Sequence, residues 1–149
     1  RIVSNKDNGS KKLVFCHFRK EMDIIEERLQ FHQIRVGKID GRITSKNKRK
    51  RIFEDMTYDV LLIQLRVGCE GLNLQSYSEV YFVSPTWNPF IEEQAIGRCH
   101  RIGQKKRVNV YRFYMNGFGE ENKTVSQDIY TTSIQNKKKL IETDIYDMI

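Results

Sequence analysis

The sequence is poor in residues that break or cross-link a chain, with two prolines, nine glycines and three cysteines among 149 residues. The cysteines Cys16, Cys69 and Cys99 form no Cys-x-x-Cys pair, and their odd number leaves one unpaired, which favours reduced thiols in a cytosolic or nuclear compartment. No apolar run approaches the roughly 20 residues that a membrane helix needs. These absences argue against a disulfide-stapled domain and against a membrane partner.

Signatures of a self-contained hydrolytic centre are also missing. The sequence has no Gly-x-x-x-x-Gly-Lys-Ser/Thr phosphate loop and no Asp-Glu pair after an apolar strand for magnesium. The adjacent pairs Cys16–His17 and Cys99–His100 lack zinc-ligand spacing, and no serine, histidine and aspartate are placed as a triad. We therefore predict no metal site in this chain.

The charge is strongly basic, with 26 Lys and Arg against 19 Asp and Glu and a net charge of +7. By itself, this excess permits nucleic acid, an acidic protein or an anionic membrane surface as a partner and does not choose among them. Six basic side chains lie between residues 42 and 51. Such a run is usually a solvated helix face, and a contact with a phosphate backbone is the alternative.

Short apolar blocks alternate with amphipathic stretches along the chain. Strands are predicted at residues 13–18, 35–40, 59–64, 79–83 and 107–113, and helices at 20–31, 44–56, 89–101 and from 124 onward. Strands that are apolar throughout indicate an α/β fold, a parallel sheet with helices on both faces. Ligands of such sheets bind outside the carboxyl ends of the strands. We expect a linker over residues 1–11, a lobe over 12–122 and a C-terminal helix packed on the lobe within 123–149.

One predicted helix carries the chemistry. Helical spacing places Gln94, Arg98 and Arg101 in one narrow sector, with Gly97 allowing close approach of a neighbouring surface. Two guanidinium groups suit the charge that develops on a transferring γ-phosphoryl group. The alternative is an exposed helix whose arginines form surface ion pairs worth about 0–1 kcal/mol each. Spacing alone does not decide between these interpretations.

Residues 94–104 closely resemble motif VI of superfamily-two helicases. Their Arg-Ile-Gly-Gln ending is similar to the Swi/Snf type rather than to the DEAD-box RNA helicases. Other stretches resemble further motifs of the family in the right order, namely residues 12–18 (motif IV), 39–44, 66–74 (motif V), 84–89 and 108–113. The resemblance covers nearly the whole chain from Lys12.

The resemblance implies a RecA-like, P-loop NTPase-like lobe, the second motor lobe of a DNA-dependent ATPase that translocates along double-stranded DNA. Its implied partners are an N-terminal RecA-like lobe of the same protein and duplex DNA, with a nucleosome or another DNA-bound protein as a further one. ATP with Mg is implied as the cofactor, bound mainly by the first lobe. Because that lobe is missing here, we predict that this chain alone hydrolyses negligible ATP.

Roles for single residues follow from the same resemblance. Arg98 and Arg101 are implied as arginine fingers for ATP on the partner lobe, and Gln94 as their link to the nucleotide or to motif V. The residues implied to couple nucleotide state to DNA grip are Gly68, Gly71, Asn73 and Gly97. Those implied to contact or support the DNA backbone are His17, Arg19, Asp40, Gly41, Thr44, Arg66 and Trp87. The resemblance also favours a contact with the phosphate backbone over a solvated face for the basic run over residues 42–51, which follows the second predicted strand.

Departures from the family pattern keep other hypotheses open. Cys69 and Glu70 alter motif V, while Ser84 and Thr86 replace the Asp and first Trp usual in their segment. A non-catalytic DNA- or protein-binding module derived from such a lobe is therefore the second hypothesis. An RNA-directed helicase is the third and is disfavoured by Trp87 and its neighbours. The nucleus is the expected location, and the cytoplasm of a virus-infected cell fits equally.

Overall fold

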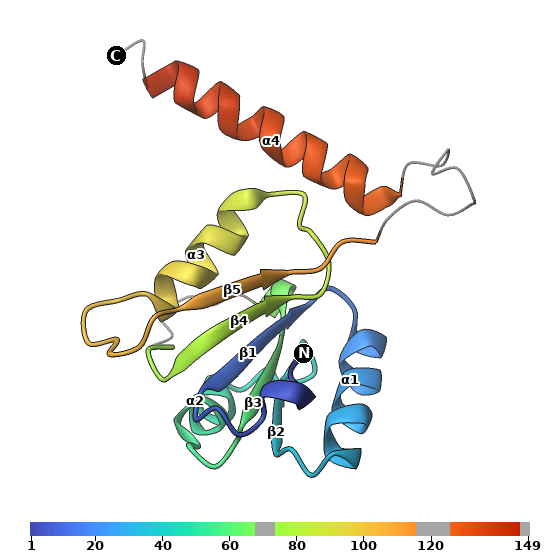
Figure 1. The fold of residues 1–149 in the computed structure, drawn as a ribbon, viewed down its shortest axis with the longest axis vertical. Coiled ribbons are helices and arrows are strands. Elements are labelled where there is room, and N and C mark those ends of the chain that lie inside the picture. The colour runs from blue at the N-terminus through green and yellow to red at the C-terminus, as the bar shows by residue number, and fades with distance from the viewer. Residues whose placement is uncertain (68–73, 116–125, 147–149) are drawn as a thin grey trace.

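A five-stranded sheet forms the centre of the computed structural model, which describes residues 1–67, 74–115 and 126–146. All neighbouring strands are parallel, in the spatial order β2-β3-β1-β4-β5 (Figure 1). The strands are β1 (Lys11–Cys16), β2 (Val36–Ile39), β3 (Val60–Gln64), β4 (Tyr77–Phe82) and β5 (Asn109–Arg112). The helices are α1 (Arg19–Phe31), α2 (Lys46–Glu54), α3 (Pro89–Cys99) and α4 (Gln127–Tyr146), with short 3-10 helices η1 (Val3–Asn5) and η2 (Leu65–Val67). The predicted parallel α/β fold is confirmed.

The two faces of the sheet carry separate apolar cores, because successive side chains of a strand point to opposite faces. In β1, Leu13 and Phe15 face the core on which α2 and α3 pack, whereas Val14 and Cys16 face the core on which α1 packs. All four side chains are buried. Helices therefore cover both faces, which is the arrangement that strands apolar throughout require.

Local side-chain caps explain where the helices begin. Ser45 accepts a hydrogen bond from the N–H of Lys48 at the start of α2. Asn88 accepts one from the N–H of Phe90 at the start of α3, where Pro89 occupies the first helical position. These caps satisfy N–H groups that have no partner within the helix.

The predicted linker, residues 1–11, contacts the lobe and includes the first residue of β1. Asn8 bridges two buried charges, because its Oδ1 accepts from Lys12 Nζ at 3.1 Å and its Nδ2 donates to Glu79 Oε1 at 2.5 Å. Lys12 and Glu79 are each 2% exposed. Removing such groups from water is costly unless they are hydrogen-bonded, so these contacts fix the segment against the sheet.

α4 lies across the start of α3 and the loop before it (Figure 1). Gln135 donates to the carbonyl of Thr86, and Lys138 Nζ donates to the carbonyl of Trp87 at 2.9 Å. α4 is thus attached to the lobe through the β4–α3 loop. In the described part of the chain, no helix combines the length and apolar composition needed to cross a membrane.

Candidate functional site

Side-chain hydrogen bonds join the loops at the carboxyl ends of four strands. Gln64, the last residue of β3, donates from Nε2 to the carbonyl of His17 at 3.2 Å and accepts from the N–H of Gly41 at 3.1 Å. His17 places Nε2 3.2 Å from the carbonyl oxygen of Pro85 in the loop after β4. The loops after β1, β2 and β4 therefore form one connected surface at this edge of the sheet, called here the carboxyl edge.

Arg19, Asp40 and Gly41 come together on the carboxyl edge in different roles. A Cβ atom at Gly41 would lie 3.2 Å from Arg19 Nη2, so glycine leaves room for that guanidinium. Asp40 is 2% exposed and accepts from the N–H and Nε of Arg42 at 2.9 and 2.8 Å. The hydrogen bond from Arg42 lowers the pKa of Asp40, although partial desolvation opposes this. Because its carboxylate is buried and anionic, Asp40 supports the turn and does not itself meet a phosphate.

Three further predicted DNA-contact residues are open to solvent. Thr44 precedes α2, Arg66 lies in η2 and Trp87 follows β4. The Trp87 side chain is 49% exposed, and its ring meets the ring of Tyr130 of α4 edge to face, with centroids 6.0 Å apart. α4 therefore holds one side of the indole while leaving half of the residue accessible.

The predicted arginine pair lies away from the carboxyl edge. The carbonyl of Arg98, near the end of α3, accepts from the N–H of Leu74 at 3.3 Å, close to the start of β4. α3 ends at Cys99, where the backbone of His100 leaves the helical region, so Arg101 lies in the following turn. The expectation of a helix through residue 101, with both guanidiniums on it, is wrong in this detail. Arg98 is therefore positioned by the end of α3, and Arg101 by the turn that follows it.

Neither arginine is buried. Arg98 is half-buried, while Gln94, Gly97 and Arg101 are exposed, and a Cβ atom at Gly97 would meet nothing within 4 Å. Within residues 1–67, 74–115 and 126–139, neither guanidinium has an ion pair or a side-chain hydrogen bond. Their charge is thus available to a ligand or to another domain. The predicted coupling residues Gly68, Gly71 and Asn73 lie outside the described residues.

Gln104 positions the turn that carries Arg101, a role that the sequence analysis missed. Its Nε2 lies 2.8 Å from the carbonyl oxygen of Gln75, 3.1 Å from that of Tyr77 and 3.4 Å from that of Cys99. One amide thereby ties the end of α3 to the start of β4. The Arg-Ile-Gly-Gln ending singles out Gln104 in the sequence, but only the tertiary structure shows which groups Gln104 contacts.

Replacing Gln104 by alanine should lower the free energy of unfolding by about 1–3 kcal/mol, because three carbonyl groups lose a shared donor. Urea unfolding followed by circular dichroism measures the change. Gln94→Ala is the matched control, since Gln94 is exposed, and it should shift stability by less than about 0.5 kcal/mol. Equal losses in the two variants would contradict the positioning role.

A buried polar cluster anchors the start of α3. Glu92 is 3% exposed, and its Oε1 accepts from the N–H of Thr86 at 3.1 Å and from Nε2 of Gln135 at 3.2 Å. Its Oε2 accepts from Arg112 Nε at 2.7 Å. Burial alone would raise the pKa of Glu92, but the hydrogen bonds from Arg112, Thr86 and Gln135 outweigh it and lower that pKa. Three separate segments of the chain therefore meet at one carboxylate.

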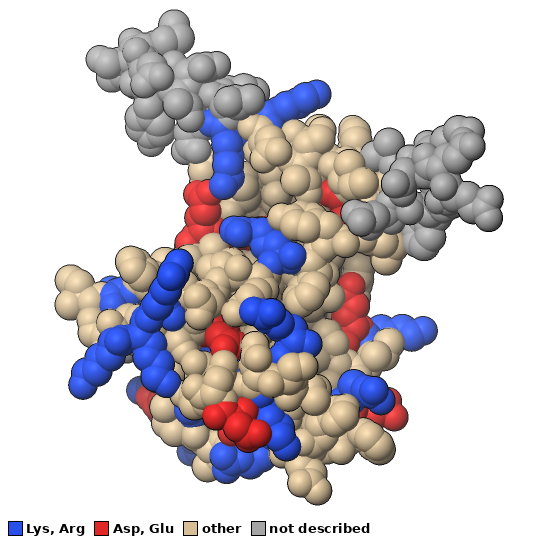
Figure 2. Space-filling model, in the orientation of Figure 1, with Lys and Arg blue, Asp and Glu red and all other residues tan. Residues whose placement is uncertain are grey.

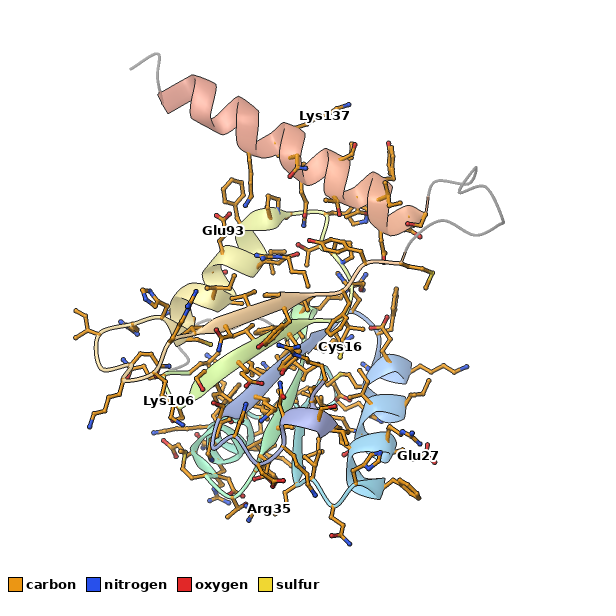
Figure 3. The ribbon with its side chains drawn as sticks, viewed as in Figure 1. Cys16, Glu27, Arg35, Glu93, Lys106 and Lys137 are labelled. Carbon is orange, nitrogen blue, oxygen red and sulfur yellow. The ribbon has the colours of Figure 1, made fainter. Side chains whose placement is uncertain are left out.

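The side chains around the α3–β5 loop and α4 are drawn in Figure 3. Lys106 lies in the loop between α3 and β5, and Glu93 lies on α3 below α4 (Figure 3). Glu93 pairs with Lys139 of α4 at 2.5 Å, with both side chains 47% exposed. α3 is therefore fixed at its start by a buried cluster and an exposed ion pair, and at its end by Gln104.

The family model for the helicase conserved C-terminal domain matches residues 1–103. The chain belongs to this family. The resemblance of this helicase C-terminal domain to Swi/Snf-type superfamily-two ATPases is confirmed by its relatives.

Two curated relatives illustrate the similarity. The domain is 36% identical over 149 residues to the DNA repair protein RAD5 of Candida albicans, covering 95% of this chain and 13% of that protein. It is 37% identical over 123 residues to the chromatin-remodeling ATPase INO80 of Schizosaccharomyces pombe, covering 80% of this chain and 8% of that protein. The helicase C-terminal domain thus spans a small part of these relatives.

A solved structure shares the fold. The C-terminal part of the Fun30 ATPase domain superposes with a TM-score of 0.67 and 24% sequence identity. The match covers 88% of this chain and 47% of that one. This likeness confirms the RecA-like architecture expected from the sequence.

Proposed function

We propose that this helicase C-terminal domain is the second motor lobe of an ATP-dependent translocase on double-stranded DNA. The observation that supports this proposal most directly is that Arg98 is only half-buried, Arg101 is exposed, and neither has an acidic partner among the described residues. A surface pair left unneutralised suits an anionic ligand held by another domain. The relatives, named as DNA repair and chromatin-remodeling proteins, support a motor acting on DNA in the nucleus.

The residues near the end of α3 fit the phosphates of ATP. Arg98 and Arg101 donate to the oxygens of the γ-phosphoryl group, where negative charge must be stabilised during transfer. Gln94, one helical turn before Arg98, is placed to orient the pair or the nucleotide. ATP with Mg, bound mainly by the first lobe, supplies the transferable phosphoryl group. This lobe's part is to bring two positive charges to it across the gap between lobes.

The carboxyl edge supplies the grip on DNA. Arg19, Arg66 and Thr44 offer donors to phosphate oxygens, and the exposed half of Trp87 packs beside the backbone. Contacts of this kind give affinity and salt dependence without sequence choice. Asp40, Gly41 and the two hydrogen bonds of Gln64 hold the loops of the carboxyl edge together. A displacement of one of these loops is therefore transmitted to the others.

The test compares the 149-residue chain with the longer protein that joins it to a phosphate-loop lobe, measuring ATP hydrolysis with duplex DNA, single strands and RNA. We expect negligible turnover by the chain alone and turnover stimulated most by duplex DNA in the joined protein. Robust metal-dependent turnover by the chain alone would refute the proposal. DNA binding without hydrolysis in the joined protein would establish the non-catalytic binding module instead.

A further inference from the structure

Nearly all of the chain's positive excess lies in one short stretch. Residues 42–51 hold six Lys or Arg and no Asp or Glu, while the net charge of the whole chain is +7. The remaining residues hold 20 basic and 19 acidic side chains, and Figure 2 shows both kinds over the face that it presents. The basic field therefore belongs to α2 and the turn before it, not to the lobe as a whole.

Packing of α2 leaves four of its five basic residues exposed, whereas Arg49 is half-buried and donates to the carbonyl of Ile43 at 2.6 Å. Ile52 and Phe53 are half-buried against the core shared with α3, so the opposite side of the helix faces solvent. The exposed basic residues of α2, called here the α2 basic face, are Lys46, Lys48, Lys50 and Arg51. No apolar side chain interrupts them between residues 46 and 51.

Acidic neighbours do not neutralise the α2 basic face. Elsewhere in the lobe, Lys38 lies 2.9 Å from Asp23, and Arg112 lies 2.7 Å from Glu92. Within the described residues, the single ion pair of the α2 basic face joins Lys50 to Glu54 at 3.7 Å, with both side chains more than half exposed (72% and 64%). Solvent weakens such a pair. The other three charges have no acidic partner among these residues.

The order of charges along α2 also opposes the helix dipole. The first turn holds Lys46 and Lys48 and no acidic residue, although the partial positive charge at a helix start favours anions. The N–H of Lys48 is already capped by Ser45, so the backbone itself has a partner there. Solvent exposure alone does not offset the unfavourable placement of these lysines at the positive end of the helix. A bound anion would be attracted by both the lysines and the helix start.

We propose that the α2 basic face binds the phosphodiester backbone of duplex DNA, as an extension of the footprint of the carboxyl edge. The proposal rests on the proposed function. α2 begins two residues after Thr44, and its nine residues span about 13 Å, or about four base-pair steps. A protein partner usually needs aromatic or apolar anchors, which this face lacks.

The test variant is Lys46→Gln with Lys48→Gln and Arg51→Gln in the 149-residue chain. Binding of a mixed-sequence duplex of about 24 base pairs is measured between roughly 50 and 200 mM salt. We expect affinity to fall at least about tenfold and the slope of log affinity against log salt to become shallower by about 2–3, because up to three phosphate contacts are lost. A charge-preserving variant, Lys46→Arg with Lys48→Arg and Arg51→Lys, should bind within about twofold of the unmodified chain.

A matched control removes the same charge elsewhere. Lys105→Gln with Arg107→Gln and Lys137→Gln changes three exposed residues, of which Lys137 points away from the lobe (Figure 3). The slope should change by less than about 1 in this variant. An equal loss in test and control variants would overturn the proposal, because general charge would then explain binding.

Other outcomes separate this inference from the proposed function. If the α2 variant binds duplex DNA like the unmodified chain while Arg66→Gln weakens binding, the α2 footprint is wrong and the carboxyl-edge grip stands. If the unmodified chain binds no duplex, the proposed DNA grip and the inference both fail. If the α2 variant keeps duplex binding but loses binding to poly-glutamate, the face takes an acidic polypeptide and the inference is overturned.

Discussion

Replacing Arg98 or Arg101 by alanine in the protein that carries both lobes should lower kcat for DNA-stimulated ATP hydrolysis by about 10³–10⁵-fold. This loss corresponds to roughly 4–7 kcal/mol of transition-state stabilisation. The reason is that neither side chain is buried or has a neutralising partner among the described residues, so their charge is free to act on a phosphoryl group. Steady-state ATP hydrolysis at saturating DNA measures the change.

Duplex binding should change much less in these variants, because the arginine pair lies away from the carboxyl edge. Arg107→Ala is a suitable control, since Arg107 is exposed and lies between α3 and β5 outside the pair. Its kcat should stay within about twofold of the unmodified protein, as expected for a surface change away from the site. Near-normal turnover in Arg98→Ala and Arg101→Ala would remove the finger assignment.

Replacing Glu92 by alanine should lower the free energy of unfolding by about 3 kcal/mol, near the lower end of the cost of breaking a buried ion pair. The substitution leaves the N–H of Thr86 and the amide of Gln135 without their acceptor, while Arg112 regains some water because it is 36% exposed. Glu93→Ala is the matched control. Its exposed pair with Lys139 predicts a loss below about 1 kcal/mol.

The same carboxylate predicts a pH dependence of stability. The pKa of Glu92 is lowered below its ordinary value of 4.5 in the folded state. Its contribution is therefore fully present above that ordinary value and is lost as the pH falls through the lowered folded pKa. Below about pH 4.5, the unmodified chain should lose stability more steeply than Glu92→Gln, which cannot ionise. If the urea midpoints of the two proteins changed in parallel with pH across this range, Glu92 would not ionise with a lowered pKa.

Much of the fold follows from local sequence pattern. Residues 60–63 are all apolar because the middle of β3 is buried on both faces, which leaves little choice of side chain. Each predicted strand agrees with an observed one to within about two residues. The cap at Asn88 and the proline after it mark the start of α3 in the same way. The convergence of His17, Gly41 and the β4 loop follows once the strands are known to be parallel.

The features that escaped prediction depend on contacts between distant residues. At the end of α3, the N–H of Leu74 donates to the carbonyl of Arg98, and the amide of Gln104 joins the carbonyls of Cys99 and Tyr77. Nothing within residues 89–101 identifies these partners. Likewise, Glu92 and Gln135 lie far apart in the chain, so their hydrogen bond has no local pattern. In the sequence, polar residues inside otherwise apolar elements, such as Lys12, were the signal that such contacts between distant residues exist.

The attachment of β5 and α4 to the rest of the lobe bears on where this unit can be cut. The family match stops at residue 103, yet β5 pairs with β4 beyond it, and α4 supplies Gln135 to the carboxylate of Glu92. A truncation at residue 103 would leave one edge of β4 unpaired, and its free N–H and C=O groups would promote intermolecular strand pairing and aggregation. The smallest piece that preserves this architecture for recombinant work therefore extends through α4.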